Sequence, residues 1–125
     1  MVFDKMYNQF NILSAAINAS SVRNEVIVSN LANNDVPDYK AKAVDFEESL
    51  EAAISRYRDT GELDLSEAKP SVRFVDQNYD YRIDENNVDV ELEMTRLYQN
   101  SIRYETMIQC LTINSKRMSM VLTGR

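Results

Sequence analysis

The chain has 125 residues, of which 44% are hydrophobic, and it carries a net charge of −6 with one cysteine and no histidine. This length limits the chain to one domain at most, and the lack of histidine removes the usual zinc ligand and the usual general base near neutral pH. The 14 basic residues form no stripe or cluster, which argues against nucleic acid as a partner.

The first 30 or so residues have apolar side chains alternately three and four positions apart, which predicts a long helix over about residues 3–33. This heptad spacing is shorter than the 3.6 residues per turn of a straight helix, so the stripe stays on one side only when the helix coils around a partner. Asn33 and Asn34, which favour a left-handed backbone, and Pro37 mark the end of the helix. The stripe comprises Phe3, Met6, Phe10, Leu13, Ile17, Ser20, Asn24, Ile27 and Leu31.

From Pro37 to Val44 the chain is expected to be extended, because proline lacks an amide donor and disfavours a helical residue before it. A short helix over residues 46–58 follows, with Asp45 and Glu48 at capping-box spacing. It is expected to end near Gly61. Its apolar face comprises Phe46, Leu50, Ala53, Ile54 and Tyr57.

Residues 61–70 are predicted to form a solvated loop. The segments VRFV and YDYRI that follow, separated by DQN, are compatible with a small β-hairpin.

Two features of the chain could suggest chemistry, and neither fits. Asp76, Asn78 and Asp80 have the spacing of the first ligands in an EF-hand loop, but Tyr81 and Asn87 replace the required glycine and bidentate glutamate. We therefore expect a solvated acidic turn and no metal. The lone cysteine, Cys110, lies beside a heptad stripe with no histidine to activate it, and we interpret it as a packing residue. No catalytic, cofactor-binding or metal-binding residue is predicted.

The last helix is predicted to begin at Asn87 or Asp89, either of which can cap it. Acidic residues near its start and basic residues near its end complement the helix dipole. Its heptad stripe comprises Val90, Met94, Leu97, Ser101, Tyr104, Ile108, Leu111, Ser115, Met118 and Leu122.

Together these elements predict a mainly α fold. Long N- and C-terminal helices pair as an antiparallel coiled-coil-like bundle, with the short middle helix, the extended segment and the small hairpin between them. The division into parts follows the charge: residues 1–34 and 87–125 are the assembly helices, with a net charge of +1, and residues 35–86 form a middle segment with a net charge of −7.

Further apolar residues beside both stripes exceed what one partner helix can cover, so we expect assembly with other copies. A two-helix hairpin within a monomer would also show the stripe. Asn24 and the seam serines either fix the register or lie where the helices splay. The residues expected at the subunit interface are Phe10, Leu13, Ile17, Ile27, Leu31, Val90, Met94, Leu97, Tyr104, Ile108, Leu111, Met118 and Leu122.

The run NEVIVSNLANNDVPDYKAKAVDFEESL resembles the N-terminal signature of flagellar basal-body rod proteins, which commonly reads close to NNLANANTPGYKA before a DFE segment. The tail that begins NNVDVELEMTRLYQN resembles their C-terminal block. The short length and the DFE segment favour the proximal member of this family. The signature turn is carried here by Asn33, Pro37, Tyr39 and Lys40. Asp38 replaces the usual glycine, so the turn either differs, or is strained, or is stabilised by the Asp38 side chain.

The resemblance implies a structural, non-enzymatic subunit that polymerises into a tubular drive shaft, which transmits torque and encloses the export channel. It implies as partners other copies, other rod proteins, an adaptor at the membrane-embedded ring and the flagellar export apparatus. It also implies a place in the periplasmic rod after export without a cleaved signal peptide, and the first residues show no targeting segment or membrane-inserting run.

A helical export chaperone or adaptor of the same secretion system is the alternative, since such a protein would also be small and acidic. For a rod subunit we expect terminal helices that are partly disordered in the free chain and become ordered on assembly, because long helices with a thin core depend on partners. Leu111→Asp or Ile27→Asp is expected to abolish incorporation.

Overall fold

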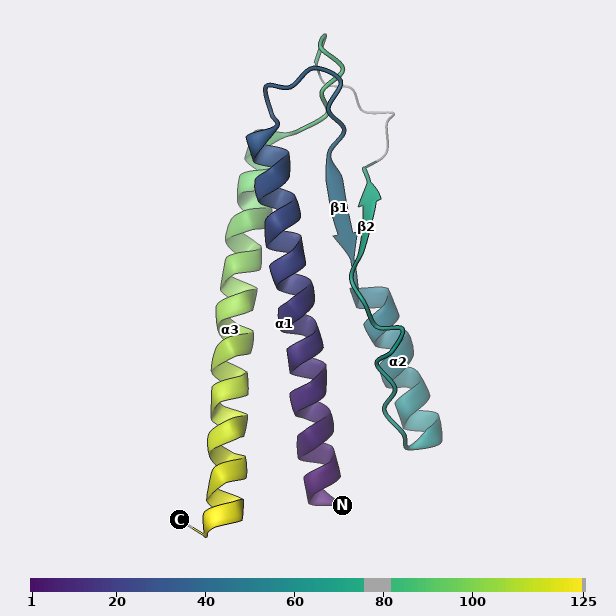
Figure 1. The fold of residues 1–125 in the computed structure, drawn as a ribbon, viewed down its shortest axis with the longest axis vertical. Helices are drawn as coiled ribbons and strands as arrows, with labels where there is room; N and C mark the ends of the chain where they lie inside the picture. The colour runs from purple at the N-terminus through teal and green to yellow at the C-terminus, as the bar shows by residue number, and fades with distance from the viewer. Residues whose placement is uncertain (76–81, 125) are drawn as a thin grey trace.

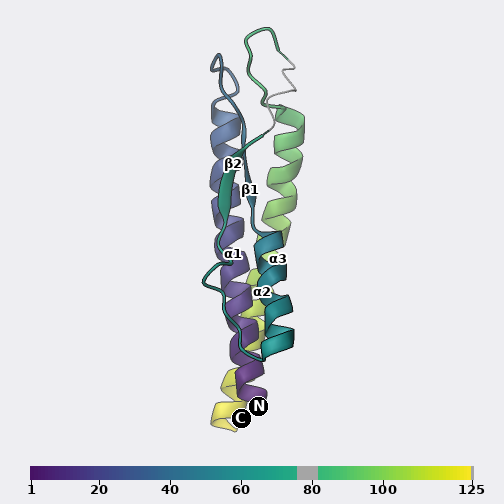
Figure 2. The ribbon, with the colours of Figure 1, turned by 90° about the vertical axis from the view of Figure 1, so that its right-hand side faces the viewer.

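A computed structural model of the chain describes residues 1–75 and 82–124 as an elongated, mainly helical molecule (Figure 1). The elements in chain order are α1 (Val2–Ala32), β1 (Lys42–Asp45), α2 (Glu47–Thr60), β2 (Ser71–Phe74) and α3 (Val90–Thr123). Helices α1 and α3 run side by side in opposite directions, and both chain ends lie at the same end of the molecule (Figures 1 and 2). The predicted antiparallel pair of terminal helices is confirmed.

Helix α1 has 31 residues and is about 46 Å long at 1.5 Å per residue. Its boundaries agree with the predicted helix, but its end is not left-handed. Asn33, the C-cap, has φ −100° and ψ 16°, and its side-chain amide donates a hydrogen bond of 2.7 Å to the carbonyl of Ser29. The side chain therefore adds a second donor to the Ser29 carbonyl, which also accepts from the Asn33 backbone amide at 3.1 Å.

Strands β1 and β2 pair antiparallel, with Lys42 opposite Phe74 and Asp45 opposite Ser71. The expected small antiparallel sheet is present, and β1 lies in the segment predicted to be extended. The partner strand differs from the expectation: VRFV was predicted to pair with YDYRI, of which residues 79–81 lie outside the described part of the chain. It pairs instead with β1, where Arg73 forms an ion pair with Asp45 and Val44 is buried beneath.

Helix α2 begins at Glu47, two residues after the predicted capping-box start, and no side chain caps it. The capping box does not form because Asp45 belongs to β1 and pairs with Arg73. Gly61 ends the helix with φ +76°, a left-handed conformation that glycine adopts without strain. Phe46 and Ala53 from the predicted apolar face join Ala19 and Ala68 in a small core, and Leu50 packs against it.

Helix α3 has 34 residues and is the longest element. Of the two predicted caps, Asp89 is the one used: its carboxylate accepts a hydrogen bond of 3.0 Å from the amide of Leu92. Gly124 closes the other end with φ +68°. No helix among the described residues is long and apolar enough to cross a membrane.

Candidate functional site

Asn30 ties the end of α1 to three other parts of the chain. Its side chain has no exposed surface. The amide nitrogen donates to the Lys42 carbonyl (2.8 Å) and to the Glu93 carboxylate (3.0 Å). The amide oxygen accepts from the Tyr39 hydroxyl (3.1 Å) and the Lys42 amide (3.0 Å). One side chain thus uses all its hydrogen-bonding capacity to join α1, the signature turn, β1 and α3.

A second buried asparagine holds the signature turn against the segment that precedes α3. The Asn86 side chain is fully buried, and its nitrogen lies within 3.0 Å of the carbonyl oxygens of Asn33, Asn34 and Val36. Its oxygen accepts from the Val88 amide at 2.8 Å. These carbonyls follow the end of α1 and also accept hydrogen bonds from the Val36 amide, the Arg82 side chain and the Tyr39 amide. Asn86 adds one common donor that joins this turn to the segment before α3.

The predicted turn residues have distinct roles at this junction. The Tyr39 hydroxyl reaches Asn30, and the Lys40 ammonium donates to the Glu85 carbonyl at 2.6 Å. Asp38 adopts φ +60°, so the turn keeps the left-handed conformation that a glycine would favour, and its amide donates to the Asp84 carbonyl at 2.9 Å. Pro37 is exposed at the tip.

Glu93 is the one carboxylate of α3 that is buried, with 3% of its surface exposed. It accepts hydrogen bonds from Asn30 at 3.0 Å and from Arg96 at 2.7 Å. A buried charge requires such partners, since an unpaired one costs several kcal/mol, on the order of the stability of a small domain. We call the polar cluster of Asn30, Tyr39, Lys42, Asn86 and Glu93 the asparagine junction.

Farther along the helix pair, Ser20 and Asn100 form a second polar contact. The Ser20 hydroxyl donates to the Asn100 side-chain oxygen, and the Asn100 nitrogen donates to the Ser20 carbonyl, both at 2.9 Å. Both residues are buried. Ser20 belongs to the predicted stripe and makes a contact between α1 and α3 that could set their register, whereas Asn24, Ser101 and Ser115 are exposed.

The seam between α1 and α3 follows a heptad pattern that is rotated by about one residue from the predicted stripe of α3. It keeps Leu97, Leu111 and Met118. At the alternate heptad position, the buried or half-buried residue stands one place before the predicted one, as Glu93 does before Met94 and Asn100 before Ser101. All other side chains of α3 are exposed. The buried and half-buried residues of this helix are Glu93, Leu97, Asn100, Met107, Leu111, Asn114 and Met118.

The residues predicted for the subunit interface therefore fall into two groups in the single chain. Ile27 is buried, and Leu13, Ile17, Leu31, Leu97, Leu111 and Met118 are half-buried along the helix pair. The others are between 36% and 67% exposed: Phe10, Val90, Met94, Tyr104, Ile108 and Leu122. Because the first group already contributes to the seam within the chain, the second group is the better candidate for contacts between copies.

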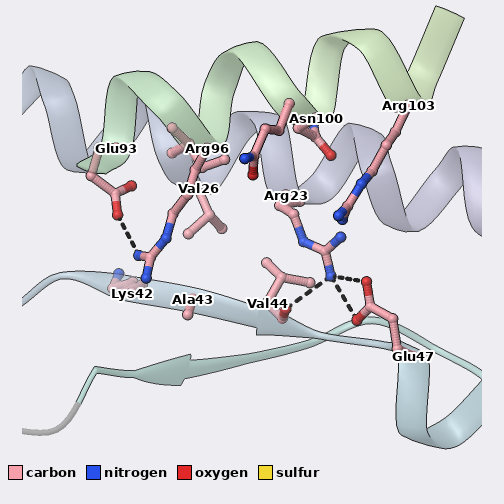
Figure 3. Close-up of a pocket in the computed structure, with 12 residues that line it drawn as sticks. Arg23, Val26, Lys42, Ala43, Val44, Glu47, Glu93, Arg96, Asn100 and Arg103 are labelled. Atoms are coloured by element: carbon pink, nitrogen blue, oxygen red, sulfur yellow. Dashed lines mark hydrogen bonds and ion pairs between the residues drawn. The ribbon is translucent and has the colours of Figure 1, made fainter. Parts of the chain in front are cut away.

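A groove runs along α1 between α3 on one side and β1 and α2 on the other; we call it the side groove. Its upper part, which lies beside β1, is about 260 Å³ in volume and contains basic side chains (Figure 3). Arg96 and Arg103 extend from α3 toward β1, and Arg23 donates to the Val44 carbonyl and to Glu47. Its lower part, of about 330 Å³, is apolar and includes Ile102.

Glu47 is the acidic partner in the side groove. Partial burial would raise the pKa of this carboxyl, but a hydrogen bond from its own backbone amide, the hydrogen bond and charge of Arg23, and the Phe46 amide together lower the pKa below its ordinary value. Arg23 and Glu47 are thus an ion pair with a structural role, linking α1 to the start of α2.

The described residues hold no cluster of histidine, cysteine, aspartate or glutamate able to bind a metal ion. Asp76, Asn78 and Asp80, which were considered as part of a calcium loop, lie outside the described residues. Cys110 is exposed in the single chain, because the seam passes on another face of α3, so the packing role predicted for it would require a neighbouring copy.

No motif or spacing in the sequence singles out Asn30, Asn86, Asn100 or Glu93. Their one signal was position: Asn30 and Asn100 each stand next to a residue of an apolar stripe, where a polar side chain must be either buried with a partner or turned outward.

No family model matches the chain. Among curated proteins, the flagellar basal body rod protein FlgB of Bacillus subtilis (strain 168) is 34% identical over 90% of this chain and 91% of its own length. FlgB of Escherichia coli (strain K12) is 28% identical over 97% of both chains. FlgB of Proteus mirabilis (strain HI4320) is 27% identical over 97% of this chain and 98% of its own.

Proposed function

This chain belongs to the family of flagellar basal body rod proteins named FlgB, and we propose that it polymerises through its terminal helices into the tubular drive shaft that transmits torque and encloses the export channel. In this proposal residues 1–34 and 87–125 are the assembly segments, and residues 35–86 fix their geometry or bridge subunits. The family is a structural one, and the relatives match across nine-tenths or more of the chain, which favours a rod subunit over an export chaperone.

The observation that carries the proposal is the uncovered apolar surface of the two long helices. Val2, Tyr7, Tyr98 and Leu122 are between 61% and 72% exposed. Apolar surface contributes roughly 25 cal/mol for each Å² removed from water, so covering each of these side chains with a neighbouring copy stabilises the assembly. Large exposed apolar side chains that gather on one face of a soluble protein are typical of an interface.

The asparagine junction suits a load-bearing subunit. A rod under torque must not let its two helices slide past each other, and apolar stripes alone permit such sliding. The hydrogen bonds of Asn30 and Ser20 to α3 are directional, so they hold one register.

The proposed partners are other copies, other rod proteins, an adaptor at the membrane-embedded ring and the export apparatus that delivers the subunit. The proposed location is the periplasmic rod, reached without cleavage of a signal peptide. Mass spectrometry of the chain in purified hook–basal bodies tests both proposals: an intact N-terminus in the rod supports them, and absence from the particle contradicts them.

A variant sharpens this experiment. Leu122→Asp places a charge on a side chain that is 67% exposed, so the subunit should fold but fail to enter the rod. Asn18→Asp adds the same charge at an exposed polar position of α1 and serves as the matched control. Equal incorporation of the two variants would contradict a role of this surface in assembly.

A further inference from the structure

The two flanks of α3 beside its seam with α1 differ in shape and charge. Arg103 and Glu105 are two positions apart, so they point about 200° apart around the helix axis. Arg103 borders the side groove, and Glu105 lies on the opposite flank. Both side chains are exposed, and neither has an ion-pair partner among residues 1–75 and 82–124.

The flank with Glu105 carries an apolar ridge. Val90, Met94, Tyr98 and Ile108 are 39%, 52%, 72% and 37% exposed. Their spacing of four, four and ten residues places them within about 80° of one another around the helix. We call these four residues and Glu105 the ridge.

The side groove on the other flank has the complementary character. Arg23, Glu47, Asn100 and Arg103 line both its upper and its lower part, so the two parts adjoin each other along α3. The lower part adds apolar walls from α1, α2 and α3, whereas the upper part adds Arg96 and Lys42. The groove therefore offers an apolar surface beside Arg103, which has no carboxylate partner among the residues that the structure describes.

We propose that the ridge of one copy lies in the side groove of a second copy, with Glu105 of the first paired with Arg103 of the second. This inference rests on the proposed function and identifies which surfaces of two subunits meet. Because the ridge and the side groove are on opposite flanks of one helix, each copy can enter one neighbour and receive another. Such a head-to-tail contact propagates into a ring or a helical tube rather than closing as a dimer.

Charge reversal tests the proposed pair in the full chain. R103E and E105R each place like charges together, so each is expected to weaken self-association in sedimentation velocity at least tenfold. The double variant R103E/E105R restores opposite charges and is expected to return within about threefold of the wild type. Both positions are exposed, and circular dichroism should show an unchanged fold.

A mixture of the single variants distinguishes this contact from others. Each single variant repels itself, but in an equimolar mixture every ridge meets an oppositely charged residue in the groove of the other variant, so the mixture should regain association through alternation of the two variants. Lys5→Glu and Glu25→Arg make the same charge changes on α1, outside both surfaces, and should behave as wild type. A double variant no better than the singles, a mixture that stays monomeric, or controls that fail equally would each overturn the proposal.

Cells provide the same test if the purified chain stays monomeric. Strains with either single variant should swim poorly, and the double variant should restore swimming. A wild-type chain present in basal bodies, together with a double variant that fails to swim, would overturn the ridge-in-groove contact alone. Absence of the wild-type chain from basal bodies would instead overturn the proposed function.

Discussion

Replacing Asn30 by alanine is the most direct test of the asparagine junction. The substitution removes four hydrogen bonds, to Lys42 twice, to Tyr39 and to Glu93, and leaves the buried Glu93 with one partner fewer. At about 1 kcal/mol for each bond the loss is about 4 kcal/mol, and alanine returns about 0.6 kcal/mol as the better helix former. We expect the free energy of unfolding to fall by about 3 kcal/mol, a large part of the total for a domain of this size.

The assay is urea unfolding followed by both circular dichroism and tyrosine fluorescence, so that coincidence of the two transitions establishes two-state behaviour. Asn24→Ala is the matched control, since Asn24 lies on the same helix with an exposed side chain. It should be neutral or stabilising by about 0.6 kcal/mol. A loss of less than about 1 kcal/mol for Asn30→Ala relative to this control would refute the view that the junction holds the fold together.

The geometry supports three further predictions. Asp38 is left-handed at φ +60°, so Asp38→Gly should raise the free energy of unfolding by about 0.5 kcal/mol and Asp38→Val should lower it by at least about 1 kcal/mol; equal stabilities in urea titrations would contradict this. In the free subunit, amide hydrogen exchange should be fast in residues 1–12 and slow in residues 27–45, because the junction secures only one end of the helix pair. If both helices were protected from exchange along their whole length, and the circular dichroism spectrum did not change on polymerisation, ordering on assembly would be ruled out. Leu111→Asp puts a carboxylate in the half-buried seam and should abolish incorporation into basal bodies, and normal swimming by that strain would count against it.

Heptad spacing was sufficient to predict the two long helices and their antiparallel pairing, because apolar periodicity reports directly which elements need a partner. It misplaced the seam of α3 by about one residue. The cause is that Glu93 and Asn100 occupy buried positions where Met94 and Ser101 were expected. A pattern of apolar residues cannot identify a buried polar residue whose partner lies 63 or 80 positions away in the chain.

The start of α2 and the pairing of β2 were missed for a related reason. Both depend on Asp45, which local spacing assigned to a helix cap. In the folded chain its carboxylate pairs with Arg73, 28 residues later, and this contact across the sheet prevails over the local cap. The end of α1 is a different case, since the Asn33 side chain bonds the Ser29 carbonyl of its own helix and the predicted left-handed turn does not form.

The placement of the polar contacts explains how a polymerising subunit can keep its own fold. A seam made only of apolar residues would not distinguish the chain's own α3 from that of a neighbouring copy, because apolar burial is non-directional. Asn30 and Ser20 add direction to the seam, since their hydrogen-bond partners Glu93 and Asn100 stand at fixed positions along α3 and so set one register, while the junction connects α1 to the chain's own α3 through the turn. Polar pairs inside a helix seam specify register in this way elsewhere at some cost in stability. The exposed apolar residues of α3 then remain available for contacts with neighbouring copies. One helix thus serves two interfaces: one within the chain, held in register by polar hydrogen bonds, and one between copies, formed by apolar side chains.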